Sequence, residues 1–305
     1  MKFKILYTVL FISSFCFGQN VNSEEILIKN DSIELPGTLT FTKENTPLLI
    51  WIHGSGNVDR NGNQGTVVKA NYIKQLRDSI NKEGFAFFSY DKRTANSKNF
   101  KHLKGILFKD LVNDAEKVIT HLKNDKRFSK IILIGHSQGS LVAMLNSNIA
   151  DQFISLAGPS ESIDKTIIKQ VTKQSAAFGK ITEDHFNELL KTGNIKKVNP
   201  LLATIFAKQN LAFIANYAKF NPVKEIKKVT IPTLIINGTK DLQVKEADAK
   251  ALQEAKPSSK LVIIKNMNHV LKQIENDADN MPSYYSADFK LSAELITTIV
   301  NFIKQ

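Results

Sequence analysis

A serine between two glycines, placed directly after a long apolar run, constrains this chain more than any other feature. Residues 131–134 are unbroken apolar sequence, and the pentapeptide Gly-His-Ser-Gln-Gly (135–139) follows them. Apolar sequence with small residues then continues from Leu141. The Gly-x-Ser-x-Gly pattern marks a sharp turn from a strand into a helix, which exposes the hydroxyl of Ser137. Glycines are needed there because the turn is strained and leaves no room for side chains.

Apolar runs of strand length alternate with helical patterns along most of the chain. Runs of this kind are typical of strands that are buried on both faces. We therefore predict an α/β fold, in which a mostly parallel central sheet carries helices on both faces. The predicted strands are 32–41, 48–52, 85–90, 131–134, 153–157, 233–237 and 261–264, and the predicted helices include 71–82, 107–122, 246–255 and 291–303.

The alternation stops between about residues 159 and 229. Helical patterns occur there around 163–178, 184–191 and 200–218, and no strand pattern is convincing. We predict one domain over residues 19–305, with this segment inserted as a helical cap over the site. The alternative is a separate helical domain.

The first 18 residues have the features of a secretory signal. Lys2 and Lys4 precede an apolar run from Ile5 to Phe17, and Gly18 supplies a small residue for cleavage. The run is short for a membrane-spanning helix. We expect cleavage after Gly18 and export to the periplasm or the medium. Lipidation at Cys16 and retention as an anchor are the alternatives.

Composition excludes several kinds of chemistry. Cys16 is the only cysteine, so the mature chain has no thiol nucleophile, no disulfide and no cysteine-ligated metal. The net charge is +12, but the lysines are scattered and form no basic stripe. We expect no cofactor, no metal, no nucleic-acid partner and no stable membrane span in the mature chain. The oligomeric state is not indicated.

A serine nucleophile needs a base that an acid orients, and after this kind of turn they follow in the order serine, acid, histidine. Asp241 lies just beyond the strand 233–237, where ligand-facing residues of parallel sheets occur. His269 follows the last strand and is the only histidine after Asp241. Asp248 is the competing acid, but it falls inside a predicted helix. The remaining helical or cap histidines, which we expect to be solvated, are His102, His121 and His185.

An oxyanion hole needs two backbone N–H groups aimed at the developing negative charge. The residue after the nucleophile, Gln138, supplies one. The loop that begins at His53 supplies the other, which we assign to Ser55, with Gly56 as the alternative. We expect His53 to support this loop by hydrogen bonding.

These motifs together resemble the α/β-hydrolases, and more narrowly the bacterial secreted esterases and serine-aminopeptidase-type (S33-like) hydrolases. The resemblance rests on Gly-Thr-Leu at 37–39, His-Gly-Ser-Gly-Asn-Val-Asp-Arg at 53–60 and Tyr-Asp-Lys-Arg at 90–93. Segment 94–97 lacks the glycines that relatives often carry. The resemblance runs from about residue 32 to the C-terminus. It implies the α/β-hydrolase fold.

The charged residues of these motifs are expected to form one ion network under the site. They are Asp59, Arg60, Asp91 and Arg93. The alternative is that Arg60 or Arg93 binds a substrate carboxylate.

The predicted activity is hydrolysis of a small carboxylic ester, with Ser137 as nucleophile, His269 as base and Asp241 as its orienting acid. A thioesterase, an amidase or an aminopeptidase would use the same residues, and a binding protein on this fold would use none. An aminopeptidase would need acidic side chains for the substrate ammonium, and the cap offers Glu161, Asp164, Glu183 and Asp184. The cap aromatics line an acyl pocket or pack the cap on the core; they are Phe178, Phe186, Phe206, Phe213, Tyr217 and Phe220.

Overall fold

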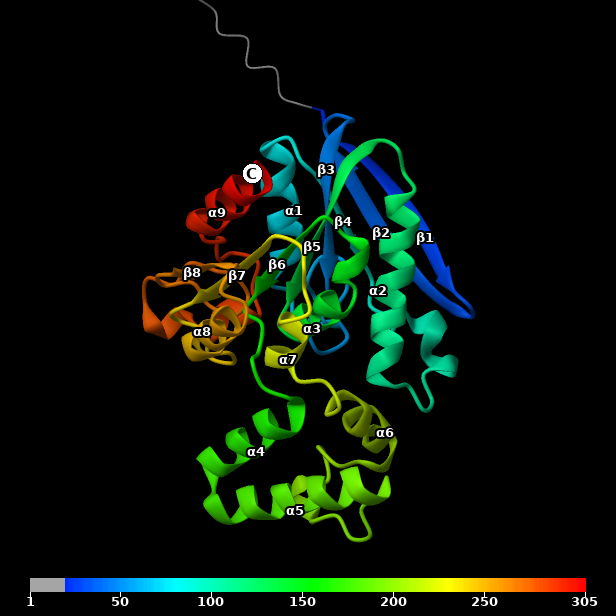
Figure 1. Cartoon of the computed structure of the whole chain (residues 1–305), viewed down its shortest axis with the longest axis vertical. Helices are drawn as coiled ribbons and strands as arrows, with labels where there is room; N and C mark the ends of the chain where they lie inside the picture. The colour runs from blue at the N-terminus through cyan, green and yellow to red at the C-terminus, as the bar shows by residue number, and fades with distance from the viewer. Residues whose placement is uncertain (1–19) are drawn as a thin grey trace, which may run out of the picture.

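One sheet of eight strands forms the centre of the protein (Figure 1). The computed structural model describes residues 20–305, and the strands lie in the order β1-β2-β4-β3-β5-β6-β7-β8. β3 to β8 pair in parallel, whereas β1 and β2 pair antiparallel with their neighbours. The prediction of an α/β-hydrolase fold with a mostly parallel sheet is confirmed. The strands are β1 (Asn22–Asn30), β2 (Ile33–Phe41), β3 (Thr46–Ile52), β4 (Ala86–Tyr90), β5 (Phe128–His136), β6 (Gln152–Leu156), β7 (Thr233–Gly238) and β8 (Lys260–Ile264).

Helices cover both faces of this sheet. Side chains alternate along a strand, so Leu48 and Ile50 of β3 enter one hydrophobic core and Leu49 and Trp51 the other. Helices α2, α3, α7 and α8 complete the first core, and α1 and α9 complete the second. The helices are α1 (Tyr72–Lys82), α2 (Phe108–Lys123), α3 (Gln138–Leu145), α4 (Ile163–Gln174), α5 (Ala176–Thr192), α6 (Lys208–Tyr217), α7 (Pro222–Ile226), α8 (Glu246–Ala255) and α9 (Ala293–Ile303).

Helices α4, α5 and α6 lie together below the sheet in Figure 1, between β6 and β7 in the chain. They fall inside the range 159–229 in which we predicted a cap. Phe186, Phe206 and Leu211 belong to a small hydrophobic core of their own. Tyr217 of α6 stacks on Phe108 of α2 with ring centroids 4.1 Å apart, which joins this unit to the main core.

The helix predicted over 163–178 is interrupted. α4 ends at Gln174, and α5 begins at Ala176. Ser175 between them has extended backbone, and its hydroxyl accepts a hydrogen bond from the amide of Phe178 at 3.4 Å. Serine is a favoured N-cap, so a helix start competes here with continuation of α4.

Strand β1 was not predicted. It pairs with β2 through a two-residue turn, because Asn30 lies opposite Ile33. Most of its side chains are exposed, and only Ile28 is buried. An edge strand with one buried side chain lacks the apolar run on which the other predictions rested.

The predicted signal, residues 1–18, lies outside the described residues, so export and cleavage stay predictions. In the part of the chain that the structure describes, no helix combines the length and apolar character needed to cross a membrane.

A buried ion pair joins the loop after β4 to helix α2. Arg93 donates to both carboxylate oxygens of Asp114, at 2.6 and 2.7 Å, and Asn30 of β1 donates to the same group at 2.8 Å. The two charged side chains are only 7% and 3% exposed. One carboxylate therefore ties three segments of the fold together.

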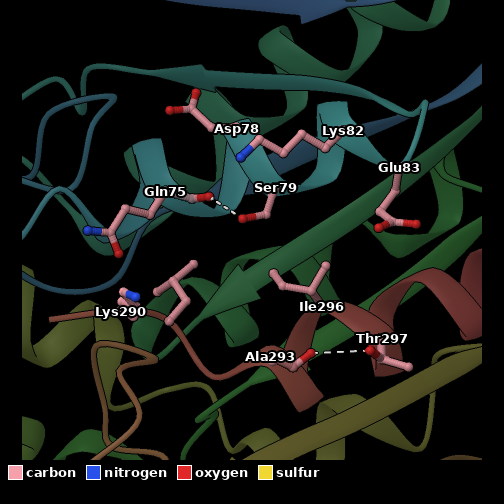
Figure 2. Close-up of a pocket in the computed structure, with 10 residues that line it drawn as sticks. Gln75, Asp78, Ser79, Lys82, Glu83, Lys290, Ala293, Ile296 and Thr297 are labelled. Atoms are coloured by element: carbon pink, nitrogen blue, oxygen red, sulfur yellow. Dashed lines mark hydrogen bonds between the residues drawn. The ribbon is translucent and has the colours of Figure 1, made fainter. Parts of the chain in front are cut away.

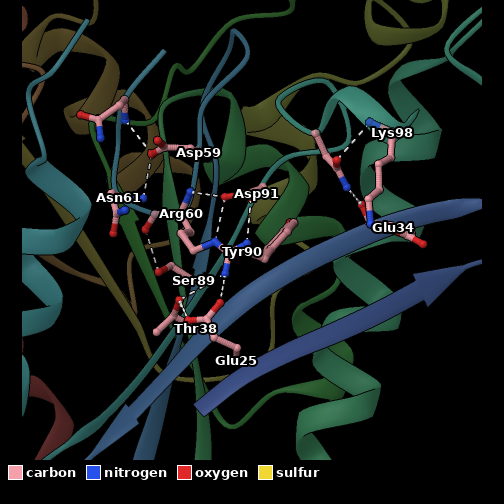
Figure 3. A network of polar contacts seen from close by, with 12 residues as sticks. Glu25, Glu34, Thr38, Asp59, Arg60, Asn61, Ser89, Tyr90, Asp91 and Lys98 are labelled. Atoms are coloured by element: carbon pink, nitrogen blue, oxygen red, sulfur yellow. Dashed lines mark hydrogen bonds and ion pairs between the residues drawn. The ribbon is translucent and has the colours of Figure 1, made fainter. Parts of the chain in front are cut away.

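Arg60 forms a second, separate network (Figure 3). It donates to both oxygens of Asp91, at 3.0 and 2.9 Å, and pairs with Glu25 of β1. Asp59 instead accepts from the backbone amides of Asn61 and Asn63.

The predicted single network is therefore wrong, because Arg93 and Asp59 have other partners. Arg60 and Arg93 each already hold a carboxylate of the chain, which argues against the alternative of substrate binding.

We predict that Asp114→Ala lowers the free energy of unfolding by about 3–5 kcal/mol, because it leaves the buried guanidinium of Arg93 without its counterion. Urea unfolding measures the change. The control is Lys74→Ala, which removes an exposed pair with Asp78 and is expected to cost no more than about 0.5 kcal/mol. Equal losses in the two variants would contradict the assignment.

Candidate functional site

Ser137 occupies a strained turn between β5 and α3. Its backbone has φ 54° and ψ −123°, which is unusual for a residue other than glycine. A Cβ at Gly139 would lie 2.2 Å from the carbonyl oxygen of Ile52, and one at Gly135 would lie 2.5 Å from that of Gly139. Only glycine fits at either position. Ser137 is partly exposed, whereas its neighbours on both sides are buried.

Asp241 and His269 meet in the loops that follow β7 and β8. His269 Nδ1 lies 2.8 Å from Asp241 Oδ2, and both side chains are almost completely buried. The second oxygen of Asp241 accepts from the backbone amides of Gln243 and Val244, at 2.7 and 2.9 Å. The carboxylate is thereby held in one orientation. Because it accepts a hydrogen bond from Nδ1–H, the neutral ring of His269 has its free lone pair on Nε2.

A cavity of about 230 Å³ brings the serine and the histidine to one place. Ser137 and His269 both line it, and Gly54 and Ser55 form another part of its wall. A serine, a histidine and a buried acid therefore belong to one site, although Ser137 precedes the other two by more than 100 residues. This is the arrangement that acyl transfer by a serine requires.

The loop after β3 approaches the serine closely. A Cβ on Gly54 would lie 3.2 Å from Ser137 Cβ, so the backbone passes directly beside the turn. Ser55 lines the cavity at Ser137 and also a second cavity of about 320 Å³, which Gln138 lines as well. Gly56 lines only the second. Ser55, unlike Gly56, therefore lines the cavity that contains Ser137, and the assignment of Gln138 and Ser55 to an oxyanion hole stays a prediction.

The second cavity lies between the core and the cap. Its wall is mainly apolar and includes Leu111 of α2, Ile167 of α4 and Phe213 of α6. Phe213 and Tyr217 pack on Phe108, as one interpretation of the cap aromatics predicts; they also line this cavity, and its use as an acyl pocket stays a prediction. Phe220 packs on Phe108 as well, and Phe186 and Phe206 pack inside the cap.

Two buried histidines support the loops of the site. His53 Nε2 donates to the carbonyl of Tyr90, as predicted for this loop. His136 Nε2 donates to the carbonyl of His269 at 2.7 Å, and its ring stacks on Trp51. A carbonyl only accepts, so both rings carry a proton on Nε2. Burial lowers the pKa of each to about 3, so both are neutral near pH 7.

A lysine that sequence analysis did not single out lies behind the site. Lys92 is buried and donates to the carbonyl of Gly54 and to the side chain of Gln138. It belongs to the Tyr-Asp-Lys-Arg segment, which was the only sequence signal for it.

The competing candidates have structural roles. Asp248 accepts from the amide and the hydroxyl of Ser160, at 3.0 and 2.7 Å, and from the amide of Lys245. The expectation that His185 is solvated is wrong, because its side chain is buried in the cap. Its Nε2 accepts a hydrogen bond from the amide of Asn199. Neither lines a cavity with Ser137.

A larger hollow, of about 630 Å³, lies between α1 and α9 (Figure 2). No histidine lines it, and the hydroxyl of its one serine, Ser79, donates to the carbonyl of Gln75 within its own helix. Size alone therefore does not identify the site. The smaller cavity is the one that Ser137 and His269 both line.

Comparisons with known proteins show that this chain is similar to esterases. The BD-FAE family model matches residues 38–255, more than two thirds of the chain. Esterase EstD of Thermotoga maritima is 24% identical over 277 residues, which cover 88% of this chain. The match spans 65% of EstD, just under two thirds of its length.

Solved structures agree with the fold. Est1E from Butyrivibrio proteoclasticus has a TM-score of 0.60 at 19% identity, covering 92% of this chain and 99% of its own. The Pyrococcus furiosus esterase Pf2001 has a TM-score of 0.58 at 16% identity, covering 93% and 92%. At such identities the likeness shows the α/β-hydrolase fold alone.

We predict that burial of His136 makes the protein sensitive to acid. A histidine has a pKa of about 6.5 in an unfolded chain, and that of buried His136 is about 3. Between these values the unfolded chain binds a proton that the folded chain does not, so stability falls as the pH falls. When the pH is lowered from 7 to 5, the free energy of unfolding of His136→Gln should therefore fall by about 2 kcal/mol less than that of the wild type.

Urea unfolding at the two pH values measures this difference. His121→Gln, at an exposed histidine of α2, is the control and should keep the dependence of the wild type. Equal losses in the wild type and His136→Gln would contradict the prediction.

Proposed function

The chain belongs to the BD-FAE family of α/β-hydrolases, and on that basis we propose that it is a serine hydrolase that cleaves carboxylic esters. The observation that carries the proposal is the hydrogen bond from His269 to Asp241 beside a cavity that Ser137 also lines. The esterase relatives support the same conclusion.

In the proposed reaction, Ser137 Oγ attacks the ester carbonyl while His269 Nε2 takes its proton. Asp241 stabilises the imidazolium that forms and keeps its ring in place. The amides of Gln138 and Ser55 hold the negative oxygen of the tetrahedral intermediate. His269 then returns the proton to the leaving alkoxide, which departs as the alcohol.

The remaining acyl-enzyme is hydrolysed by the same groups. His269 takes a proton from water, the hydroxide adds to the acyl carbon, and the tetrahedral intermediate again places its oxygen against the two amides. Collapse releases the carboxylic acid and returns the proton to Ser137. The cycle uses no group from outside the chain other than water.

The acyl group is proposed to occupy the 320 Å³ cavity, because Gln138 and Ser55 line it and most of its wall is apolar. A structure of the relative Est1E contains bound ferulic acid, an aromatic carboxylic acid. The aromatic rings of Phe213 and Tyr217 suit an acyl group of similar chemistry.

An aminopeptidase receives less support than an esterase. None of the acidic cap residues lines either cavity near Ser137. Glu161 pairs with Lys169, and Glu183 and Asp184 pair with Lys180. A substrate ammonium would therefore find no carboxylate among the residues that line these walls. A thioesterase or an amidase would use the same groups, and a screen with ester, thioester and amide substrates separates them.

We predict that Ser137→Ala abolishes hydrolysis of short p-nitrophenyl esters and labelling by a fluorophosphonate probe, because the nucleophile is lost. Rates and in-gel fluorescence measure the two effects. Ser140→Ala is the matched control, since Ser140 lies one turn further along α3, is buried and bonds to Ser155 at 2.7 Å. It should retain labelling. Undiminished hydrolysis by Ser137→Ala would exclude the proposed mechanism.

We also predict that Ile167→Trp, which fills part of the 320 Å³ cavity, shifts selectivity toward short acyl groups. The measurement is kcat/KM for p-nitrophenyl octanoate divided by kcat/KM for p-nitrophenyl acetate, and this ratio should fall at least tenfold. A tenfold change is about the discrimination that one or two methylene groups supply. Leu201→Trp, at an exposed cap position, is the control. An unchanged ratio would place the acyl group elsewhere.

A further inference from the structure

Lys92 joins the two segments that carry the proposed oxyanion donors. Its ammonium nitrogen lies 2.8 Å from the carbonyl oxygen of Gly54 and 3.1 Å from the side-chain oxygen of Gln138. We propose, resting on the function proposed above, that Lys92 is a positioning residue that orients and polarises the oxyanion hole.

The contact with Gly54 acts on the Ser55 amide directly. The carbonyl of Gly54 and the N–H of Ser55 belong to one planar trans peptide unit, so they point in opposite directions. A donor that holds the carbonyl from behind therefore fixes the direction of the N–H. It also polarises the peptide, which strengthens the hydrogen bond that the N–H gives to an anion.

The contact with Gln138 orders the other donor. Gln138 is the first residue of α3, and its side chain accepts from Lys92 while its backbone N–H faces the site in the proposed mechanism. One ammonium group thus holds both sides of the hole at a fixed separation. Lys92 also lines the cavity proposed for the acyl group, so its charge lies close to the reacting atoms.

The charge of Lys92 has no counterion of its own. In the described part of the chain no carboxylate lies within 4 Å of its nitrogen, and the acid whose charge acts on it, Asp114, is bonded to Arg93. Burial lowers the pKa of Lys92 to about 7, so the ammonium and the neutral amine are both populated near pH 7, and the proposed role belongs to the ammonium form. A buried cation without a partner destabilises the fold, whereas a methionine of similar length would pack there without that penalty. The oxyanion of the intermediate is the negative charge that the proposed reaction brings to this place.

The decisive experiment compares kcat and KM of the wild type, Lys92→Met and Lys256→Met on one p-nitrophenyl ester. Lys256 is the matched control, because it is half-buried and likewise donates to a backbone carbonyl, that of Val229 at 2.7 Å. We expect Lys92→Met to lose about ten- to a hundredfold in kcat, less than removal of a direct donor, with KM changed by less than about threefold. Lys256→Met should retain the wild-type kcat.

Chemical rescue separates this role from a merely structural one. Lys92→Cys should be as slow as Lys92→Met, and alkylation with 2-bromoethylamine, which restores an ammonium at lysine length, should recover most of kcat. Wild-type protein treated in the same way controls for modification of Cys16, the only native cysteine. If Lys92→Met does not fold, Lys92→Gln takes its place, and thermal unfolding verifies each variant.

Three results would overturn the proposal for Lys92: an unchanged kcat in folded Lys92→Met, an equal fall in Lys256→Met, or no recovery in alkylated, folded Lys92→Cys. Failure of the underlying function has a different signature. In that case Ser137→Ala keeps the activity of the wild type, whatever the lysine variants show.

Discussion

The contact between the turn after β5 and the end of β3 is the constraint on which the site depends. At Gly139 the two backbones approach so closely that a single added carbon would overlap the carbonyl of Ile52. This contact holds α3 directly against the sheet and keeps Ser137 at its strained φ. The same packing brings Gly54 against Ser137, so the serine and the loop proposed to hold the oxyanion are positioned together. A change that opened the contact would displace both.

Loops packed this tightly bury their polar groups, and those groups need partners. Side chains from neighbouring loops supply them. His53 donates to the carbonyl of Tyr90, His136 to that of His269, and Lys92 to that of Gly54. The two histidine bonds each link the end of one strand to the loop after another, and the lysine bond links the loops after β4 and β3. The site is therefore rigid through side-chain to backbone bonds rather than through additional secondary structure, and two of the three donors are neutral because burial disfavours their charged form.

Features that depend on local pattern could be predicted from the sequence. The central strands are continuous apolar runs, and Asp241 and His269 follow strands in a fixed order after Ser137. Features that depend on distant partners could not. Strand β1 has one buried side chain, the partner of Arg93 is a helix residue 21 positions away, and His185 is buried by a segment that follows its helix. A lysine in a polar loop is expected to be solvated, and only the fold shows that Lys92 is buried.

A buried, unpaired cation is the kind of local conflict that natural sequences retain where function requires it. Lys92 donates two hydrogen bonds, both to neutral acceptors, so its protonated form is stabilised by hydrogen bonds and not by an opposite charge in the resting protein. An anion formed beside it would gain more in this low-dielectric surrounding than in water, because the cation and the two amides are already oriented. The cost in folding stability and the gain in the reaction thus have the same origin. That relation is consistent with the place of the lysine, which contacts the peptide unit between Gly54 and Ser55 from the side of the carbonyl.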